Sequence, residues 1–296
     1  IQMHISGFVN IIGNPNVGKS TLMNALVGEK LSIITSKAQT TRHRILGIVN
    51  GDDFQIVFSD TPGILKPSYK LQESMMNFVR GALSDADVLL YVTDTVERDD
   101  ERAAEVLDRI RQSGVPTLVV VNKIDLTTQE ALEALVEKWH ATLPDAEIIP
   151  ISAKEGFNIA GLFDRILALL PEGEPFYPKD TLTDKTLRFF ASEIIREKIL
   201  RNYDKEIPYS CEIEIEAYKE EPDIDRISAV IYVARNSQKG ILIGHKGEKL
   251  KKVGQQAREE MEEFLQKKVF LQLFVKVSDD WRNDQRQLRR FGYDPQ

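Results

Sequence analysis

The sequence predicts an α/β domain followed by a smaller α+β domain. In the first part, short apolar runs that have the character of buried strands alternate with helical segments, as at residues 8–12, 54–59 and 118–121. Residues 171–178 contain three prolines and one glycine, a composition typical of a linker. Beyond them the pattern changes to amphipathic helices and to strands that alternate with period two. We therefore expect domains at 1–172 and 181–296, the second with a C-terminal helix, and a linker at 173–180.

The first apolar run leads into a glycine-rich loop at residues 13–20, GNPNVGKS. The loop matches the G-x-x-x-x-G-K-[ST] pattern and lies between a predicted strand and a predicted helix. Gly13 and Gly18 let the backbone wrap a phosphate, and the start of the helix adds partial positive charge. Lys19 can reach the outer phosphates, and the Ser20 hydroxyl can bind Mg²⁺. The predicted nucleotide-binding residues here are Gly13, Asn14, Asn16, Val17, Gly18, Lys19, Ser20 and Thr21.

A second motif predicts which base is bound. The apolar run at 118–121 ends in Asn122-Lys123-Ile124-Asp125, an N-K-x-D motif at the carboxyl end of a strand, where α/β sheets bind ligands. The Asp125 carboxylate can accept two hydrogen bonds, from N1 and N2 of guanine, and adenine has no donors at these positions. Lys123 can lie along the base, and Asn122 can tie this loop to the glycine-rich loop. The motif predicts a preference for guanine nucleotides of about two to four orders of magnitude.

Three weaker segments complete the set. In the D-x-x-G motif at residues 60–63, Asp60 would hold Mg²⁺ through water, and the Gly63 N–H would sense the γ-phosphate. The polar segment at 37–42 is the candidate switch loop, and its Thr41 is assigned to the Mg²⁺ shell. A further apolar run leads into Ser152-Ala153-Lys154, where the Ala153 N–H could meet guanine O6. The metal ligands predicted are Ser20, Thr41 and Asp60.

Five stretches of the chain resemble the Era family of translation-factor-class GTPases. They are residues 13–24, 37–44 (KAQTTRHR), 60–63, 122–125 and 189–200 (FFASEIIREKIL), and the resemblance covers nearly the whole chain. The second and last of them distinguish Era from other small GTPases. The resemblance implies a Ras-like P-loop GTPase domain, with a mixed, mostly parallel sheet flanked by helices, followed by a type II KH domain. It implies GTP hydrolysis, with catalytic roles for Asn16, Lys19, Thr41 and Gly63.

The residue that follows the D-x-x-G motif raises the question of what positions the attacking water. Many GTPases use a glutamine there to orient the attacking water, whereas this chain has Ile64, which forms no side-chain hydrogen bonds. In related family members an asparagine at the position of Asn16 accompanies a K⁺ ion beside the phosphates. Such an ion could offset charge between the β- and γ-phosphates. The alternative is that Asn16 only shapes the loop. The cofactors expected are GTP or GDP, Mg²⁺ and, if the first alternative holds, K⁺.

The second candidate site is the G-x-x-G turn at residues 244–247. In KH domains such a turn joins two helices and clamps about four nucleotides by their backbone, while apolar residues such as Ile241, Leu242 and Ile243 form a floor under the bases. The predicted order of helix, two strands, helix, turn, helix and strand fits the type II KH arrangement. The chain's net charge of -7 lies entirely in residues 1–179, and residues 235–252 form a basic stripe. The predicted RNA-binding residues are Ile241, Ile243, Gly244, His245, Lys246, Gly247, Lys249, Lys251 and Lys252.

These features predict a GTP-driven, RNA-binding switch. The resemblance implies that the RNA is the 3′ end of 16S ribosomal RNA and that the protein assists assembly of the 30S subunit. We expect the protein to be a monomer. The single cysteine, Cys211, fits a reducing cytosol, and no apolar run reaches the roughly 18 residues that span a bilayer. The family reading leaves open a peripheral association with the inner face of the cell membrane. The alternative is a nucleotide-dependent interaction protein whose second domain docks on a protein or membrane surface.

Overall fold

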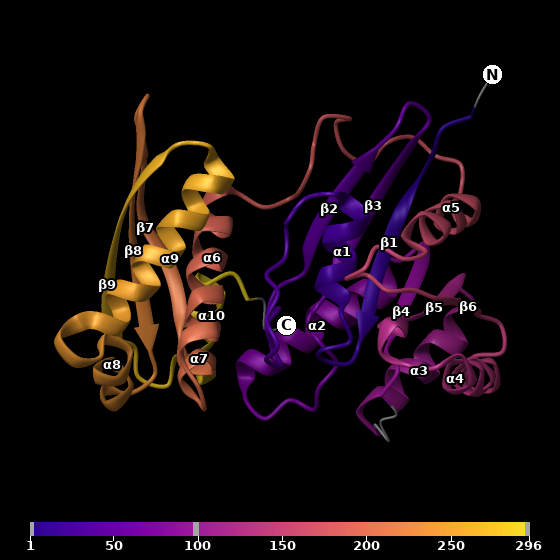
Figure 1. Cartoon of the computed structure of the whole chain (residues 1–296), viewed down its shortest axis with the longest axis horizontal. Helices are drawn as coiled ribbons and strands as arrows, with labels where there is room; N and C mark the ends of the chain where they lie inside the picture. The colour runs from indigo at the N-terminus through magenta and orange to yellow at the C-terminus, as the bar shows by residue number, and fades with distance from the viewer. Residues whose placement is uncertain (1–2, 97–100, 294–296) are drawn as a thin grey trace. The chain divides into compact units, whose positions relative to one another are not determined.

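The computed structural model describes residues 3–96 and 101–293, and its contacts divide the chain into two units. The first unit contains the residues up to 184 except 68–74, and the second contains residues 68–74 and those from 185 onward. Figure 1 shows the helices and strands of both. Each unit has its own sheet, with six and three strands in the described chain, so each is treated separately below.

The first unit is built on a mixed sheet in the order β2-β3-β1-β4-β5-β6, of which only the β2–β3 pair is antiparallel. This is the mostly parallel α/β arrangement that the sequence predicts. The inner strands β4 and β5 are apolar and buried because helices cover the faces of a parallel sheet. The strands are β1 (Ile5–Gly13), β2 (Ile45–Asn50), β3 (Phe54–Asp60), β4 (Val88–Thr93), β5 (Thr117–Val121) and β6 (Glu147–Pro150).

The helices of this unit alternate with the strands along the chain and flank the sheet (Figure 1). Strands β1, β3, β5 and β6 run parallel, so their carboxyl ends meet at one edge of the sheet. The loops that follow them carry the motifs singled out above, and ligands bind at this edge in open α/β sheets. The helices are α1 (Lys19–Val27), α2 (Lys70–Ser84), α3 (Glu101–Ser113), the 3₁₀ turn η1 (Ile124–Leu126), α4 (Gln129–Thr142) and α5 (Ile159–Leu169).

Residues 176–184, which we call the strap, lie along the open edge of β2 in the first unit. The Ile48 N–H donates to the Leu182 carbonyl at 2.8 Å, and the Leu46 N–H donates to Asp184 Oδ1 at 3.1 Å. The Gln55 side chain accepts from the N–H groups of residues 176 and 177 and donates to the carbonyl of Tyr177. The Tyr177 ring packs on a small apolar cluster from β2 and β3. Part of the predicted linker is therefore bound to the first unit.

The second unit has the element order of a type II KH domain, as the sequence predicts. In its sheet, β7 pairs antiparallel with β8, and β8 pairs parallel with β9. The buried faces of α6, α8 and α9 pack on one side of this sheet and form a single core with it. The elements are α6 (Leu187–Asn202), α7 (Ile207–Ser210), β7 (Glu212–Glu220), β8 (Ile224–Val233), α8 (Asn236–Ile243), η2 (His245–Gly247), α9 (Glu248–Leu265) and β9 (Lys268–Val277).

The C-terminal segment contains the turn η3 (Trp281–Asn283) and the short helix α10 (Gln285–Arg290). The Trp281 indole is fully buried, and its N–H donates to the Ser210 carbonyl at 2.8 Å. The Phe291 ring lies 5.7 Å from the Trp281 ring and 5.4 Å from the Tyr232 ring of β8. These contacts fix the segment against the second unit.

Candidate functional site

The glycine-rich loop follows β1 and ends at the start of α1. A Cβ atom on Gly13 would lie 2.3 Å from the Val92 carbonyl, and one on Gly18 would lie 2.2 Å from the Asn122 amide nitrogen. Gly18 also has a φ of +95°, a left-handed conformation that favours glycine. The loop therefore requires glycine at both positions of its motif. Lys19 is almost fully buried, and its ammonium donates to the Asn14 carbonyl at 2.7 Å.

Ser20, Thr41 and Asp60 come from three segments and meet beside the loop. The Ser20 hydroxyl donates to Asp60 Oδ2 at 2.7 Å and lies 3.0 Å from the Thr41 hydroxyl. Asp60 is fully buried, and burial raises the pKa of its carboxyl, against the effects of the Ser20 hydrogen bond and the Lys19 charge. Two hydroxyls and one carboxylate form an oxygen-only donor set, which is the kind that Mg²⁺ prefers. The three predicted metal ligands are thus brought together.

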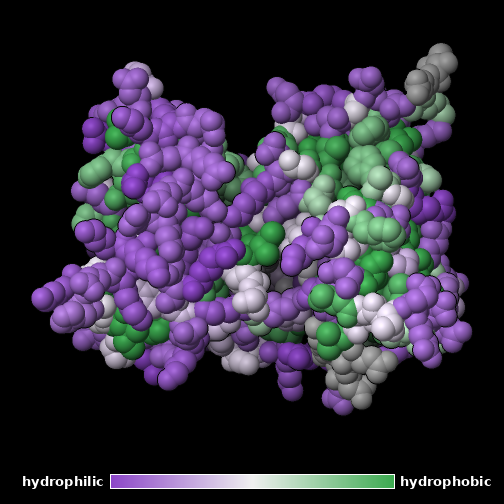
Figure 2. Space-filling view, viewed as in Figure 1, coloured by the Kyte–Doolittle hydropathy of each residue, from purple (hydrophilic) through white to green (hydrophobic). Residues whose placement is uncertain are grey.

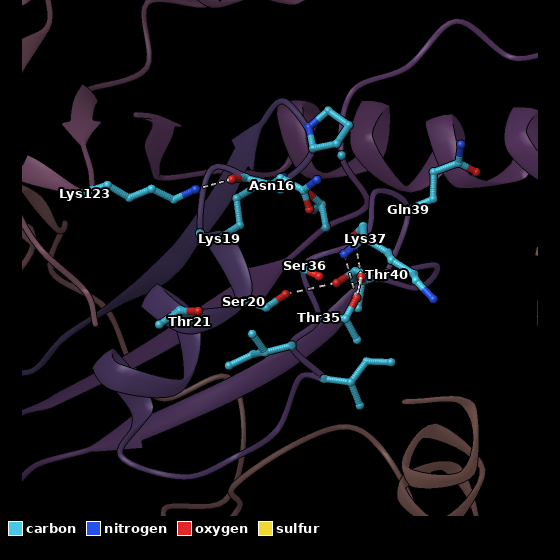
Figure 3. Close-up of a pocket in the computed structure, with 17 residues that line it drawn as sticks. Asn16, Lys19, Ser20, Thr21, Thr35, Ser36, Lys37, Gln39, Thr40 and Lys123 are labelled. Atoms are coloured by element: carbon cyan, nitrogen blue, oxygen red, sulfur yellow. Dashed lines mark hydrogen bonds between the residues drawn. The ribbon is translucent and has the colours of Figure 1, made fainter. Parts of the chain in front are cut away.

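Ser20 and Thr41 line a cavity of about 410 Å³ between the glycine-rich loop and the switch loop. Figure 3 shows Asn16, Lys19, Ser20 and Thr21 on one side, and Thr35, Ser36, Lys37 and Thr40 on the other. The Thr40 hydroxyl donates to the Lys37 carbonyl at 2.8 Å and lies 2.6 Å from the Thr35 hydroxyl. The switch loop thus turns back on itself and directs Thr41, rather than Thr40, toward Ser20. Residues 33–36 also line the cavity and escaped the sequence interpretation, although they extend the same non-periodic segment.

Asn122 connects three loops at the carboxyl edge of the sheet. Its side-chain amide donates to the Val17 carbonyl at 2.9 Å and accepts from the Ala153 N–H at 3.0 Å. The first of these is the bond to the glycine-rich loop that the sequence predicts. The second involves the N–H that was assigned to guanine O6, so that N–H would have to be shared between Asn122 and the base. The role of Ala153 in base binding stays a prediction.

The other N-K-x-D side chains are also held in place. Lys123 has a φ of +64°, and its ammonium donates to the Asn16 carbonyl at 2.6 Å and pairs with the buried Asp94 at 3.3 Å. Asp94 lies outside every motif, and sequence reasoning missed it. Asp125 accepts a hydrogen bond from the Ser152 hydroxyl at 2.8 Å, which ties the two base-binding loops together. Lys154 is exposed at the rim of the same region.

Ile64 and Asn16, the two residues on which the mechanism of hydrolysis depends, have different environments. Ile64 is 2 % exposed, and its main-chain N–H donates to the Gly13 carbonyl at 3.0 Å. A buried alkyl group cannot orient a water molecule, which agrees with the sequence reasoning. Gly63, next to it, lies so close to the glycine-rich loop that a Cβ atom would be 2.9 Å from Pro15. Asn16 lines the cavity with a φ of +63°, a conformation that asparagine tolerates better than most residues.

The G-x-x-G turn of the second unit joins α8 to α9. Gly244, Lys246 and Gly247 all have positive φ, and the Gly247 N–H donates to the Gly244 carbonyl at 3.2 Å. The Tyr203 hydroxyl donates to the Leu242 carbonyl at the end of α8, and burial raises the pKa of this tyrosine to about 12, so it remains a donor at neutral pH. A fixed, glycine-containing turn with exposed Lys246 offers main-chain N–H groups to a phosphate backbone.

Beside this turn lies a groove of about 510 Å³ between α9 and β9. Its basic residues are Lys251 and Arg258, of which Arg258 pairs with Glu262 of the same helix, and Leu250, Leu271 and Leu273 supply its apolar walls. Sequence reasoning assigned Lys251 but missed the others, because the pairing of α9 with β9 is a tertiary contact. Lys249 and Lys252 are exposed on α9 (the face of this unit that carries α9 is mainly hydrophilic, Figure 2).

One part of the apolar floor was wrongly assigned. Leu242 is fully buried in the core of the second unit, so it cannot lie under RNA bases. Its neighbours differ because α8 presents them on another side: Ile241 is 46 % exposed and Ile243 is half-buried. His245 is exposed in the turn itself. Within the described residues, no helix is both long enough and apolar enough to cross a membrane.

Comparisons with known proteins identify both domains. The model of the 50S ribosome-binding GTPase family matches residues 8–123, and the KH domain model matches residues 206–282. GTPase Era of Syntrophus aciditrophicus is 46% identical over 293 residues, which cover 98% of this chain and 96% of that protein. GTPase Era of Staphylococcus haemolyticus is 45% identical over 294 residues, which cover 98% of this chain and 97% of that protein.

Two solved structures extend the comparison to the fold. A variant of Era from Aquifex aeolicus bound to GDP and AlF₄⁻ has a TM-score of 0.93 and 42% sequence identity, covering 98% of this chain and 99% of that one. A structure of Era in complex with MgGDPNP and nucleotides 1506–1542 of 16S ribosomal RNA gives the same values. The chain therefore belongs to the Era family: it is a GTPase whose nucleotide-binding domain is followed by a KH domain.

Proposed function

We propose that this GTPase is a switch that binds the 3′ end of 16S ribosomal RNA and assists assembly of the 30S ribosomal subunit in the cytoplasm. The observation that carries the proposal is the groove between α9 and β9, which begins at the G-x-x-G turn and combines apolar walls with Lys251 and Arg258. The related Era structure in complex with a fragment of 16S ribosomal RNA supports the choice of RNA. A surface of this kind fits a single RNA strand better than an apolar protein partner.

In the nucleotide domain, we assign GTP to the cavity between the glycine-rich loop and the switch loop. Lys19 and the main-chain N–H groups of the loop would bind the phosphates, and Asp125 would select guanine. Ser20, Thr41 and Asp60 fit Mg²⁺ by the chemistry of their oxygens, and the ion would supply charge neutralisation at the phosphates. The main-chain N–H of Gly63 would contact the γ-phosphate. Because glycine has no Cβ, this N–H can lie close to the glycine-rich loop.

GTP hydrolysis would affect the rest of the chain through the switch loop. Within the described residues, the hydrogen bond of the Thr41 side chain is to the Ser20 hydroxyl, at 3.0 Å, so its position would depend on what else binds these oxygens. The switch loop continues directly into β2, and β2 carries the strap, residues 176–184, on its edge. The strap leads into the KH domain at α6, so a change around Thr41 has a continuous main-chain route toward that domain.

A filter-binding assay tests the proposal. The full chain, loaded either with a GTP analogue or with GDP, is titrated with a fragment from the 3′ end of 16S ribosomal RNA and with a shuffled sequence of the same composition. We expect tighter binding to the native sequence and a difference between the two nucleotide states. Equal affinity for the native and shuffled RNA in both states would contradict the proposal and favour a protein or membrane partner for the second domain.

A further inference from the structure

The face of the KH-domain sheet that points away from α6, α8 and α9 is partly covered, and its β9 side is the more exposed. Along this face the register pairs Tyr232 with Lys276, Val230 with Phe274 and Arg226 with Phe270. The C-terminal segment covers the first row, because Phe291 lies on Tyr232, and Arg290 pairs with Glu214 of β7 at 2.6 Å. In the other two rows Val230 is buried, whereas the two phenylalanines of β9 are exposed to solvent.

The exposed part of this face, on β9, carries two aromatic side chains flanked by two lysines. On β9, the residues at even positions from 268 to 276 point outward, because those at odd positions pack on the core. Phe270 and Phe274 are 45 % and 48 % exposed. We call this set the β9 strip; it consists of Lys268, Phe270, Gln272, Phe274 and Lys276.

The charge and geometry of the β9 strip fit a single-stranded nucleic acid, which is a polyanion whose bases are flat rings. Lys268 and Lys276 are exposed at its two ends. The Arg226 guanidinium lies 5.6 Å from the centre of the Phe270 ring, and Glu221, the acid beside it, is 3.3 Å from the Arg226 Nε. Single-stranded nucleic acids bind where basic groups flank aromatic rings, because each base can stack on a ring and each phosphate can meet a cation.

The strip is also continuous with the proposed RNA groove. Leu271 and Leu273, on the same strand, form the wall of that groove on the other face of the sheet. In the described sheet β9 pairs with β8 on one side and forms the edge on the other. An RNA strand that leaves the groove therefore has to pass one strand edge to reach Phe270 and Phe274.

We propose that the β9 strip is a second binding surface for single-stranded RNA, on which bases stack on Phe270 and Phe274 while Lys268 and Lys276 contact the phosphates. This inference rests on the proposed RNA-binding function and extends the RNA path beyond the G-x-x-G groove. The strip takes nucleotides that flank those held in the groove, so it contributes to the affinity for long RNA and not for short RNA.

The test uses the full chain and two labelled RNAs from the 3′ end of 16S ribosomal RNA. One has about four nucleotides, the number that a KH groove holds, and the other about three times as many. Fluorescence anisotropy gives the affinity of each. The double variant Phe270→Ala/Phe274→Ala should lower the affinity for the long RNA by about tenfold or more and leave the affinity for the short RNA unchanged. Phe270→Tyr/Phe274→Tyr should retain the affinity, and Phe270→Leu/Phe274→Leu should lose it, because leucine is apolar but cannot stack.

Two controls separate the possible failures. Phe157→Ala removes an even more exposed phenylalanine from the nucleotide domain and should change neither affinity. Gly247→Asp, in the groove, should lower the affinity for both RNAs. If it lowers neither, the proposed RNA-binding function is contradicted, and not only the role of the β9 strip. If Gly247→Asp acts as expected but the double alanine variant binds long RNA normally, or the leucine variant keeps full affinity, the stacking proposal is overturned. Equal losses on long and short RNA would also overturn it.

Discussion

At the scale of single residues, the guanine site depends on side chains that hold loops as well as on those that would touch the nucleotide. Asn122 joins the glycine-rich loop to the Ala153 loop, and Ser152 holds Asp125 by a hydrogen bond of 2.8 Å. A carboxylate fixed in this way keeps further acceptor positions for the guanine base that we assign to it. Base selection by Asp125 should therefore be sharp and easy to reverse.

Asp125→Asn exchanges an acceptor for a donor. We expect GTP affinity to fall about a hundredfold or more and affinity for xanthosine triphosphate to rise, because xanthine presents a carbonyl where guanine has its amino group. Competition binding with both nucleotides measures the change. Ser152→Ala serves as the matched control, since it loosens Asp125 without changing its chemistry and should lower GTP affinity without any gain for xanthine. An Asp125→Asn variant that still prefers GTP would refute the assignment.

Hydrolysis should depend on K⁺ through Asn16. Replacing K⁺ with Na⁺ at equal ionic strength is expected to slow turnover about a hundredfold, the usual cost of losing one well-placed charge stabiliser. Because Asn16 has a φ of +63°, Asn16→Gly removes the amide but allows this conformation, whereas Asn16→Ala also strains the loop.

Both variants should lose the difference between the two ions, and only the alanine variant should also lose GTP affinity. Ile64→Ala should mainly reduce stability, by about 2–5 kcal/mol, because Ile64 is a buried core residue. Equal wild-type rates in K⁺ and Na⁺ would leave Asn16 with the loop-shaping role alone.

At the scale of elements, the parts that the sequence predicts are those set by local pattern. The apolar run of β5, the glycine-rich loop and the helix Glu248–Leu265 each carry their own signal. The groove walls at Leu271 and Leu273, the Lys123–Asp94 pair and the strap on β2 do not, because each depends on segments that meet only in the folded chain. Leu242 was misassigned for a related reason: three consecutive residues on a short helix point to different sides.

The position of the G-x-x-G turn should depend on Tyr203. Its hydroxyl satisfies the Leu242 carbonyl at the end of α8, so Tyr203→Phe leaves a buried acceptor without this donor. We expect a loss of about 1–3 kcal/mol in the free energy of unfolding, together with weaker RNA binding. Urea denaturation and anisotropy with RNA measure the two effects. Tyr218→Phe, a tyrosine bonded to Asp225 elsewhere in the same domain, is the control: it should affect stability more than RNA affinity.

At the scale of the whole molecule, the two activities lie in different units of the chain and should be separable by mutation. All residues assigned to GTP precede residue 155, and all residues assigned to RNA follow residue 240. The groove and the nucleotide cavity share no lining residue. Loss of one activity should therefore leave intrinsic binding at the other site intact.

Gly247→Asp tests this separation. A Cβ at Gly247 would meet no atom within 4 Å, so the substitution is tolerated sterically, although the φ of +72° adds some strain. The carboxylate should repel the RNA backbone and weaken RNA binding about tenfold or more, while GTP affinity stays unchanged. Gly247→Asn has the same shape without the charge and should weaken RNA less. If the two variants behave alike, shape rather than charge governs the turn.

The strap on β2 has a consequence for any attempt to produce the nucleotide domain alone. A chain cut at residue 172, where the composition suggests a boundary, would lack the partners of the Ile48 and Leu46 N–H groups and would bare the apolar cluster under Tyr177. A bare strand edge beside apolar side chains is a template for intermolecular pairing. Such a fragment should aggregate at concentrations where one ending at residue 184 stays monomeric, and light scattering of the two fragments would reveal whether those last twelve residues act as a built-in guard against self-association.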